Sequence, residues 1–433
     1  MRPIEDVSRR AASVTIIADD LSGAADSAVA CAERGLETVV TLSDASNAEE
    51  ADAVALDADT RRLSADAAAA EIARVVRARA GGAGILFKKI DSTLRGHVGA
   101  EVAALIAERR RMISAAAPRP VAVVAPAFPA QGRTTIGGCQ RLDGVPLEAT
   151  ELWRRERMTG GASVLEMIRA AGVTGALVPI ETVRRGEDAV GAAIAGLVDR
   201  ADALVCDAET DDDLAAVARA SLTIGRDCVW VGSAGLVGHL IDAAGLTRAR
   251  NGVLRVPAVA GPLMFVVGSL SPVSRRQADR LAAEDVAVVA IDGPTRAGWA
   301  DAADRLRGAI AAGRDVLILS TPQVAPSREE AAAQSAALAG VVTPHAAHIG
   351  GLFVTGGETA RAVLTSMRVT SLRLVAEIEQ GVPLSVAVAP RPFPIITKAG
   401  AFGGAATMVN CRRALREWSS VPAAGAAVRK AQE

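Results

Sequence analysis

Polar residues gather at two points in the first part of the chain, in a pattern that suits a small anionic ligand. Asp19 and Asp20 follow the apolar run VTIIA and come just before a turn of small residues. A second group lies in segment 87–97, after the apolar run ILF, and consists of Lys88, Lys89, Asp91, Ser92, Thr93 and Arg95. Burying so many polar groups is costly unless they pair with one another or with a ligand, so we expect a binding site here.

These charges predict a clamp for a small carboxylate. Arg61, in the segment DADTRR, also follows a strand-like run, and together with Lys89 it can offer charge-assisted hydrogen bonds. Side chains alternate along a strand, so Lys89 and Asp91 should share one side, which leaves Lys88 as a solvated flank. Of the two adjacent aspartates, one can cap the following helix while the other hydrogen-bonds a substrate hydroxyl.

Three glycine-containing segments of the second half also follow apolar runs. They are VVGSLSPVS at 266–274, VTGGETA at 354–360 and TKAGAFGG at 397–404. Glycines at strand-to-helix turns let backbone N–H groups approach phosphate oxygens, and the helix N-terminus adds its dipole. Each segment alone equally fits an ordinary tight turn. Three in one half, one of them containing one of only four lysines in the chain (Lys398), favour a nucleotide site.

Other phosphate-binding and cofactor-binding patterns fit less well. The sequence contains no GxxxxGK[ST] loop and no protein-kinase set of Gly-rich loop, HRD and DFG motifs. The glycines of GSAGLVG, residues 232–238, are spaced GxxGxxG, whereas a dinucleotide site needs GxGxxG. An NAD-linked dehydrogenase for small acids is therefore an alternative without its expected fingerprint.

Strand-like and helix-like segments alternate through most of the chain, which predicts α/β domains with mainly parallel sheets flanked by helices. Strands such as VTIIA and ILFKKI are separated by helices, one of them from about Ser64 to Ala80. The pattern breaks between Thr247 and Gly261 and then resumes, so we divide the chain into domains 1–250 and 251–433. We expect the active site in the cleft between the two domains.

Composition restricts the class of protein. Mean hydropathy is +0.27, yet no run approaches the ~18 to 20 apolar residues that a spanning helix needs. A net charge of −1 provides no field to attract nucleic acid or an anionic membrane. Five scattered cysteines fit reduced thiols and no signal peptide is visible, so we expect a cytoplasmic protein. His345 and His348 lack a third ligand nearby in sequence, which argues against a zinc site.

Eight collinear motifs together resemble the four-carbon acid sugar kinase family. Between about residues 15 and 404 they read IADDLSGAADS, KKIDSTLRG, AFPAQGRTTIGGCQRLDGVPL, DAETDDDL, VGSAGL, GSLSPVSRRQ, TGGETARAVL and KAGAFG. Many relatives read ADDLTGA and TKSGGFG, so Ser22 and Ala399 are small departures. Ser22 keeps the hydroxyl, whereas Ala399 loses one in the glycine-containing segment.

The resemblance implies a phosphotransferase with an alcohol group as acceptor, whose N-terminal domain binds a sugar acid and whose C-terminal domain binds ATP. With Arg95 added from the residue pattern, the substrate contacts are Asp19, Asp20, Arg61, Lys89, Ile90, Asp91, Ser92 and Arg95. With Lys398 added in the same way, the ATP contacts are Ser269, Ser271, Gly356, Gly357, Glu358, Thr359, Lys398, Gly400 and Gly403. The acceptor implied is the 4-hydroxyl of a tetronate, with D-threonate favoured over D-erythronate or a 3-oxo-tetronate by overall likeness.

For phosphoryl transfer we expect Arg61 and Lys89 to hold the substrate carboxylate, while Asp20 and Asp91 orient its hydroxyls and one of them acts as base. His97 is a weaker candidate for the base. Mg²⁺ would bridge the ATP phosphates through ligands that the sequence does not identify. A rival hypothesis is a sugar-acid sensor without turnover, against which the intact GGET turn and Lys398 argue. The preferred stereoisomer and the oligomeric state are left open, and a homo-oligomer is compatible with the sequence.

Overall fold

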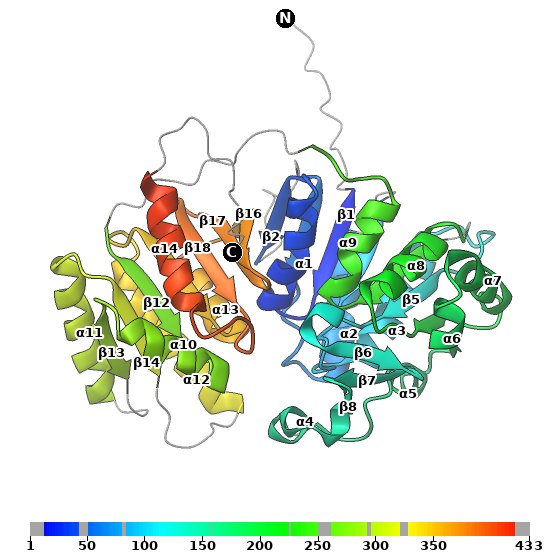
Figure 1. Cartoon of the computed structure of the whole chain (residues 1–433), viewed down its shortest axis with the longest axis horizontal. Helices are drawn as coiled ribbons and strands as arrows, with labels where there is room; N and C mark the ends of the chain where they lie inside the picture. Colours follow the sequence, from blue (N-terminus) through cyan, green and yellow to red (C-terminus); the bar gives the residue numbers. More distant parts are fainter. Residues whose placement is uncertain are drawn as a thin grey trace, which may run out of the picture. The chain divides into compact units, whose positions relative to one another are not determined.

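The chain folds into two α/β units. The computed structural model describes residues 13–42, 51–79, 84–156, 158–224, 227–249, 261–291, 296–320 and 328–420. The two compact units are Met1–Ala249 and Arg250–Glu433 (Figure 1). Most of the segment between Thr247 and Gly261, where the sequence pattern breaks, lies outside the described residues.

The first unit is built on a parallel sheet with strand order β2-β3-β1-β4-β11-β5-β10-β9. Its strands are β1 (Val14–Ala18), β2 (Thr38–Thr41), β3 (Ala53–Asp57), β4 (Ile85–Lys89), β5 (Val121–Ala125), β9 (Gly175–Val178), β10 (Ala203–Cys206) and β11 (Cys228–Gly232). The register pairs Ala18 of β1 with Asp57 of β3 and with Lys89 of β4. The carboxyl ends of these three strands therefore lie level with one another.

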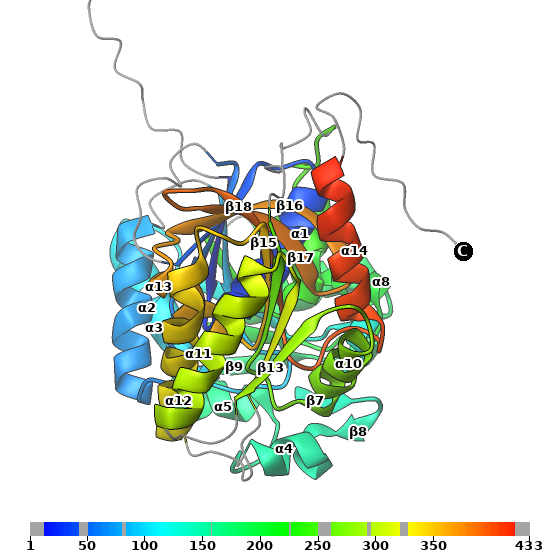
Figure 2. The same ribbon diagram turned by 90° about the vertical axis from the view of Figure 1, so that its left-hand side faces the viewer.

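Helices cover both faces of this sheet, as the alternation predicted. They are α1 (Leu21–Glu33), α2 (Ala65–Arg79), α3 (Val98–Met112), α4 (Glu151–Arg155), α5 (Val164–Ala170), α6 (Ile180–Val183), α7 (Glu187–Leu197), α8 (Asp211–Leu222) and α9 (Ala234–Ala243), with 3₁₀ turns η2 (Pro129–Gln131) and η3 (Leu147–Ala149). Helices α2 and α3 lie on one face, and α1, α8 and α9 lie on the other (Figures 1 and 2). The helix predicted from 64 to 80 is confirmed as α2.

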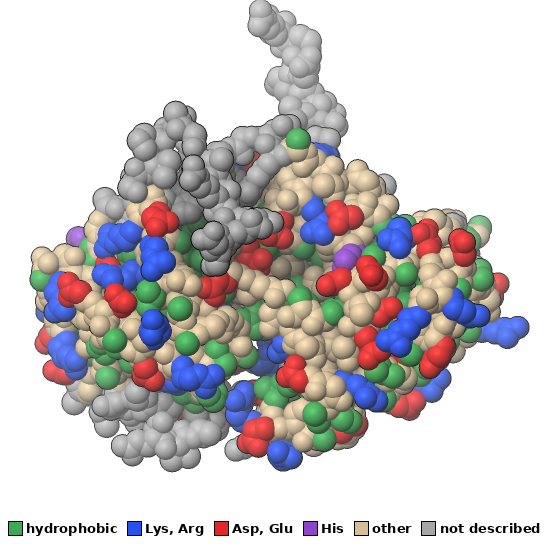
Figure 3. All heavy atoms as spheres, viewed as in Figure 1, with side chains coloured by type: hydrophobic (Ala, Val, Ile, Leu, Met, Phe, Trp, Pro, Cys, Tyr) green, Lys and Arg blue, Asp and Glu red, His purple; other side chains and the backbone are tan. Residues whose placement is uncertain are grey.

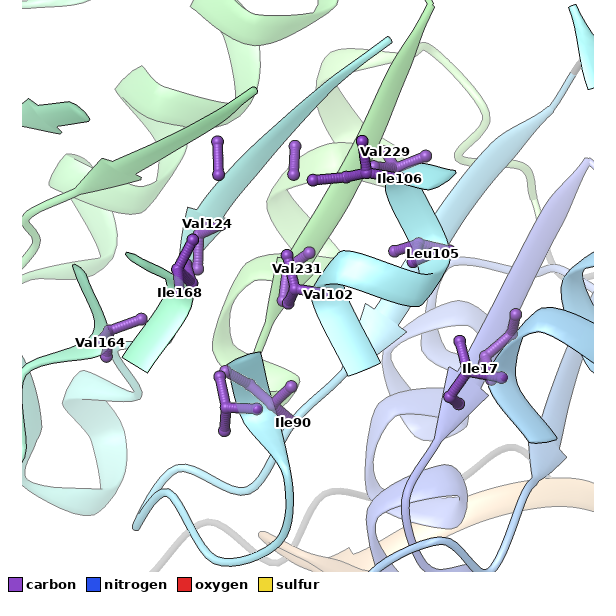
Figure 4. Packing of buried hydrophobic residues seen from close by; sticks show 14 of the residues in the cluster. Ile17, Ile90, Val102, Leu105, Ile106, Val124, Val164, Ile168, Val229 and Val231 are labelled. Carbon is purple, nitrogen blue, oxygen red and sulfur yellow. The ribbon is translucent and has the colours of Figure 1, made fainter. Parts of the chain in front are cut away.

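The core of the first unit anchors the segment that follows β4. Ile90 is 1% exposed and belongs to a cluster of buried aliphatic side chains that includes Val102 of α3 and Val231 of β11 (Figure 4). Burying a side chain of this size contributes about 1.5–3 kcal/mol. The polar residues from Asp91 onward thus begin from a fixed point in the core.

A small antiparallel sheet, which the sequence pattern did not predict, braces the same segment. It consists of β6 (Arg133–Ile136), β7 (Cys139–Leu142) and β8 (Val145–Pro146). Its first turn is held by Asp207, whose carboxylate accepts hydrogen bonds of 2.8 Å from the N–H groups of both Gly137 and Gly138. The buried amide of Gln140 donates to the Ser92 carbonyl at 3.0 Å. The hairpin therefore fixes the chain just after Asp91.

The second unit has a mixed sheet with strand order β13-β14-β12-β15-β18-β17-β16. Its strands are β12 (Leu263–Val267), β13 (Ala287–Ile291), β14 (Val316–Ser320), β15 (Gly351–Thr355), β16 (Ser371–Glu379), β17 (Val382–Val388) and β18 (Phe393–Lys398). The pairs from β13 to β18 are parallel, whereas β17 is antiparallel to both β18 and β16. Strand β16 was not predicted, because we assigned no element to residues 371–379 from the sequence.

Helices lie on both faces of the second sheet as well. They are α10 (Pro272–Ala282), α11 (Arg296–Ala311), α12 (Arg328–Val342), α13 (Gly357–Ser366) and α14 (Thr407–Ser420), with the 3₁₀ turn η4 (Thr343–His345). Helices α10 and α14 pack on one face, and α11, α12 and α13 lie on the other (Figure 2). No helix within the described ranges is long and apolar enough to cross a membrane. On the face shown in Figure 3, acidic and basic side chains are interspersed.

Lys88 is buried, so the prediction of a solvated flank was wrong. Its side chain is 0% exposed and its Nζ lies 2.7 Å from Oε2 of Glu101 in α3, which is 1% exposed. The same Nζ donates to the carbonyl of Lys89 at 2.9 Å. The strand pattern could not reveal this pair, because Glu101 reaches Lys88 only through the packing of α3 on the sheet.

We predict that Lys88→Met lowers the free energy of unfolding by about 3–5 kcal/mol, because the carboxylate of Glu101 is then buried without its partner. The double variant Lys88→Met/Glu101→Met should recover most of this loss, since it replaces both charges by apolar groups. Urea unfolding followed by circular dichroism measures both effects. A loss below about 1 kcal/mol in the single variant would contradict a buried, fully charged pair.

Candidate active site

The polar residues predicted from the first half of the sequence converge at one end of the first sheet. Asp19 and Asp20 follow β1, Arg61 follows β3, and the segment from Ile90 to Arg95 follows β4. Strands β3, β1 and β4 are neighbours, so their carboxyl ends form one edge. Ligands of open α/β sheets bind beyond such an edge.

Arg61 is held by the two adjacent aspartates. Its Nε and Nη2 donate to the two carboxylate oxygens of Asp19 at 2.7 and 3.0 Å, and its Nη1 donates to Oδ2 of Asp20 at 2.5 Å. Burial alone would raise the pKa of Asp19, but Arg61 and Lys88 outweigh it, so this pKa lies below its ordinary value. Burial opposes the charge of Arg61, yet the two aspartates raise its pKa well above the ordinary value.

Asp20 also caps helix α1, as expected for one member of the aspartate pair. Its Oδ1 accepts a hydrogen bond of 2.8 Å from the N–H of Gly23, while its backbone is extended as an N-cap residue requires. Both oxygens of Asp20 are therefore engaged, one by the helix and the other by Arg61. The cap and the ion pair together fix the carboxylate in one orientation.

Asp91 is held in a second group of charges. Its Oδ2 accepts from the Thr93 hydroxyl at 2.6 Å and from Nε of Arg95 at 2.6 Å. Burial would raise the pKa of Asp91, but the charges of Arg95 and Arg61 outweigh it and hold the pKa well below its ordinary value. Strand β4 ends at Lys89, so the predicted strand alternation does not reach Asp91, which lies in the following turn instead.

Lys89 is a buried cation of this region for which no ion pair is recorded among the described residues. It is 4% exposed, and the hydrogen bond recorded for its Nζ among the described residues goes to the Ile90 carbonyl at 2.9 Å. The side chain passes over Gly23, where an added Cβ would lie 3.0 Å from Nζ of Lys89 and 2.8 Å from Oδ1 of Asp20. A buried ammonium with spare donors beside two aspartates suits a bound carboxylate.

Asp26 is a member of this neighbourhood that the sequence analysis missed. It lies three residues after Gly23 in α1, which places it on the helix face that Lys89 passes over. Burial raises the pKa of Asp26 to about 6, although the charge of Lys89 acts in the opposite direction. The signal was present in IADDLSGAADS, where the helical spacing from the turn points to Asp26.

The other predicted residues of the first unit, Ile90, Ser92 and His97, have groups that are buried in the core or already hydrogen-bonded within the protein. The side chain of Ile90 lies in the core, and its N–H donates to Gly232 at 2.8 Å. Ser92 is 7% exposed and its carbonyl is held by Gln140. The ring of His97 contacts the Leu63 carbonyl through Nε2 at 2.6 Å, and the residue stands at the N-cap of α3. His97 therefore has a structural partner.

We predict that Asp26→Asn stabilises the protein in a pH-dependent way. The folded-state pKa of about 6 lies above the ordinary 3.8, so the folded state binds more protons between these values, and the free energy of unfolding falls as pH rises through this window. The variant should match the wild type below about pH 4 and exceed it above about pH 6. Urea unfolding across pH tests this, with the exposed Asp279→Asn as control. An equal change at every pH would contradict the raised pKa.

The three glycine-containing segments of the second unit meet at one edge of its sheet. They follow β12, β15 and β18, which are adjacent strands. A Cβ added at Gly400 would lie 2.1 Å from Oγ of Ser269, and one added at Gly356 would lie 3.5 Å from the backbone nitrogen of Ser269. Gly268 in turn approaches Thr359. Ser269 therefore lies between the other two segments.

The neighbouring turns supply backbone and hydroxyl donors at this edge. Gly356 has φ of +98°, and helix α13 begins at the next residue. The N-terminal N–H groups of such a helix have no intrahelical acceptor and attract anions. Ser271 is the N-cap of α10 and its N–H donates to Oγ of Ser269 at 3.2 Å. The edge is suited to a phosphate group.

Lys398 lies at this edge, but its ammonium faces the protein. The residue is 1% exposed, and its Nζ donates to the carbonyls of Ala399 at 2.9 Å and Phe402 at 3.0 Å. Burial lowers its pKa to about 8. Among the described residues, no three or more His, Cys, Asp or Glu side chains form a group that could hold a metal ion.

Comparisons with known proteins give a different description to each of the two units. A family model described as a sugar-binding N-terminal domain matches residues 14–240, and one described as a nucleotide-binding C-terminal domain matches residues 264–408. The chain is 41% identical over 423 residues to a D-threonate kinase of Cupriavidus necator, covering 94% of this chain and 99% of the relative. It is 32% identical to a 3-oxo-tetronate kinase of Methylobacterium radiotolerans, covering 90% and 96%.

The fold is shared with solved structures. A crystal structure from Salmonella typhimurium LT2 matches with a TM-score of 0.77 at 20% identity, covering 93% of this chain and 99% of that chain. One from Haemophilus influenzae matches with a TM-score of 0.68 at 20% identity, covering 93% and 100%. Fold and site thus define a two-domain α/β protein with a sugar-binding and a nucleotide-binding domain. The chain belongs to the four-carbon acid sugar kinase family.

Proposed function

We propose that this protein transfers the γ-phosphoryl group of ATP to the 4-hydroxyl of a four-carbon sugar acid, with D-threonate as the preferred substrate. The observation that carries the proposal is Lys89, a buried ammonium whose recorded hydrogen bond goes to a carbonyl, beside carboxylates that can accept hydrogen bonds from hydroxyls. It lies in the unit that the sugar-binding model matches. The 41% identity to a D-threonate kinase supports the choice of acid.

The carboxylate of the acid binds to Lys89 and to the remaining N–H groups of Arg61. Arg61 carries five N–H donors and uses three in its contacts with Asp19 and Asp20, so two stay available. The aspartates hold its guanidinium in place, which spares the ordering of a long side chain when the ligand binds. Lys89 supplies a positive charge with spare donors, since the hydrogen bond recorded for its Nζ goes to the Ile90 carbonyl.

The hydroxyls of the acid bind to the ionised carboxylates. The depressed pKa values of Asp19 and Asp91 keep them ionised at neutral pH, so they accept hydrogen bonds but are weak bases. Phosphoryl transfer needs positioning more than proton abstraction, because the alcohol proton leaves late. Asp20 and Asp91 orient the reacting hydroxyl. Asp26, with a pKa of about 6, is a proton acceptor closer to the working pH.

ATP binds to the second unit at the edge formed by Ser269, Ser271, Gly356–Thr359 and the turn after Lys398. Backbone N–H groups and hydroxyls cradle its phosphates there. Mg²⁺ is usually held by one or two carboxylates together with substrate phosphates, and the exposed Glu358 in the first turn of α13 offers such a carboxylate. Mg²⁺ held there would neutralise part of the charge on the phosphates. Phosphoryl transfer requires the bound acid and the γ-phosphate of ATP to come together.

Two alternatives carry different predictions. The relatives include 3-oxo-tetronate and D-erythronate kinases, so the acid could differ from D-threonate by one oxidation state or one stereocentre. A sensor without turnover would bind the acid but consume no ATP. We place the protein in the cytoplasm, because ATP is available there and the five cysteines are free thiols.

A coupled assay of ADP release tests the proposed reaction. D- and L-threonate, D- and L-erythronate and their 3-oxo forms are each supplied with ATP and Mg²⁺, and phosphorus NMR locates the phosphate in the product. We expect the highest kcat/KM with D-threonate and a phosphate on the 4-oxygen. Acid binding by calorimetry without ADP release for any member of the panel would favour the sensor and refute the kinase.

We predict that Lys89→Met raises the KM for the acid roughly 10-fold to 100-fold, because one charge-assisted hydrogen bond to its carboxylate is lost. The KM for ATP should change less than about 3-fold. Steady-state kinetics of the variant measure these values, with the exposed Arg169→Met as the matched control. A KM for the acid equal to that of the wild type would refute the assignment of Lys89.

A further inference from the structure

The surroundings of Lys398 are unusual for a lysine in a nucleotide-binding segment. Its Nζ is surrounded by four oxygens: the carbonyls of Ala399 (2.9 Å), Phe402 (3.0 Å) and Gly400 (3.3 Å), and Oγ of Ser274 (3.4 Å). No ion pair is recorded for it in the described part of the chain. The carboxylate of Glu379 is itself engaged by Thr407 and Asn410 of α14. The ammonium of Lys398 is thus surrounded by oxygen atoms in the way that a bound monovalent metal ion would be.

This arrangement determines where the peptide groups of the turn point. In a trans peptide the C=O and the N–H of the next residue point in opposite directions. When the carbonyls of Ala399, Gly400 and Phe402 converge on Nζ, the N–H groups of the residues that follow each of them point away from it. Those residues are Gly400, Ala401 and Gly403, and for none of these N–H groups is a hydrogen bond recorded among the described residues. Backbone N–H groups that lack an acceptor within one glycine-containing turn are available to bind an anion.

Two side chains of helix α10 also donate hydrogen bonds to carbonyls of this turn. Oγ of Ser274 donates to the Gly400 carbonyl at 2.7 Å. Nε2 of Gln277 donates to the carbonyls of Phe402 and Gly404 at 3.0 and 2.8 Å. Both side chains belong to α10, the helix that begins after Ser271. The turn is therefore fixed from β18 by the ammonium and from α10 by two polar side chains.

The carbonyl of Lys398 links this turn to the next glycine segment. It accepts hydrogen bonds from the N–H of Gly356 at 3.1 Å and from Oγ1 of Thr355 at 3.1 Å. The orientation of residues 398–403 thus fixes the position of the GGET turn as well. A substitution of Lys398 should therefore alter both the turn at residues 398–403 and the GGET turn.

We propose that Lys398 is a positioning residue, an internal cation that turns the carbonyls of residues 399–402 inward so that the intervening N–H groups face a nucleotide phosphate. This inference rests on the proposed function of the second unit as the ATP site. It differs from the usual role of a lysine near phosphate, in which the ammonium itself contacts the ligand. At 1% exposure, Nζ has no free path to a phosphate without leaving its carbonyls.

A guanidinium cannot replace this ammonium. Arginine presents a planar fork of donors, whereas the four oxygens around Nζ require a compact cation. The preference explains why a chain that uses only four lysines among 48 basic residues has one here. Titration should also matter, because burial lowers the pKa of Lys398 to about 8, while the charge of Glu379 of β16 acts in the opposite direction. The nearby thiol of Cys411 of α14 is neutral at this pH, because burial raises its pKa.

The first test uses the protein without nucleotide. Amide hydrogen exchange is measured for Phe402 and Gly356, whose N–H groups donate to the Ala399 and Lys398 carbonyls. In Lys398→Met, and to a smaller extent in Ser274→Ala, we expect exchange at both amides to be at least about 10-fold faster than in the wild type. The exposed Arg413→Met of α14 is the control and should match the wild type. Unchanged exchange in Lys398→Met and Ser274→Ala would overturn the proposal.

The second test uses kinetics. Lys398→Met should raise the KM for ATP roughly 10-fold or more and leave the KM for the acid within about 3-fold. The wild-type KM for ATP should rise above about pH 8, where the ammonium loses its proton, and this rise should be absent in the variant. In Lys398→Ala, added methylammonium should restore part of the ATP affinity, whereas Lys398→Arg should behave like Lys398→Met. Full retention of ATP affinity in Lys398→Arg would indicate a direct phosphate contact and overturn the proposal.

The two tests separate this inference from the proposed function. Faster exchange in the nucleotide-free variant, together with no ATP consumption by the wild type on any tetronate, would refute the kinase but support the internal cation. Wild-type activity together with unchanged exchange in the variant would support the kinase and refute the internal cation.

Discussion

The pairing of Arg61 with Asp19 and Asp20 is the interaction on which the candidate acid site depends. Asp19, Asp20 and Arg61 follow two neighbouring strands, and their burial depends on this pairing, since an unpaired buried charge is strongly destabilising. The pairing fixes the direction of both carboxylates and starts helix α1 at the correct residue. The two aspartates and Arg61 leave one negative charge in excess, and the charge of Lys89 acts on Asp19 from nearby. The hydrogen bond recorded for Lys89 goes to the Ile90 carbonyl, so its ammonium keeps donors for a bound anion.

The second unit also buries a cation near its proposed ligand site, but it does so without an ion pair among the described residues. Its edge carries glycines and hydroxyls in place of ion pairs, and its buried cation, Lys398, is compensated by carbonyl dipoles. Carbonyls drawn toward an ammonium leave N–H groups directed the opposite way. In the sites that we propose, the first unit binds an anion with side-chain charge, whereas the second binds one with its backbone. The two family models, one for sugar binding and one for nucleotide binding, match the units in this order.

Sequence reasoning reached the residues at strand ends because parallel strands place their carboxyl ends at one edge, so Asp19, Arg61 and Lys89 had to converge. It did not reach contacts set by tertiary packing. Lys88 looked exposed, because its partner Glu101 reaches it only through the docking of α3. The brace from Gln140 to Ser92 depends on a small hairpin with no clear period. Position alone suggested that Lys398 would face phosphate, and only the geometry of the turn shows its ammonium on carbonyls.

The most direct test of the account is a crystal structure of the protein with D-threonate bound. We expect a carboxylate oxygen of D-threonate within about 3 Å of Nζ of Lys89, with the ion pairs from Arg61 to both aspartates retained. The account would be contradicted by a D-threonate carboxylate bound elsewhere while Lys89 still donates only to the Ile90 carbonyl.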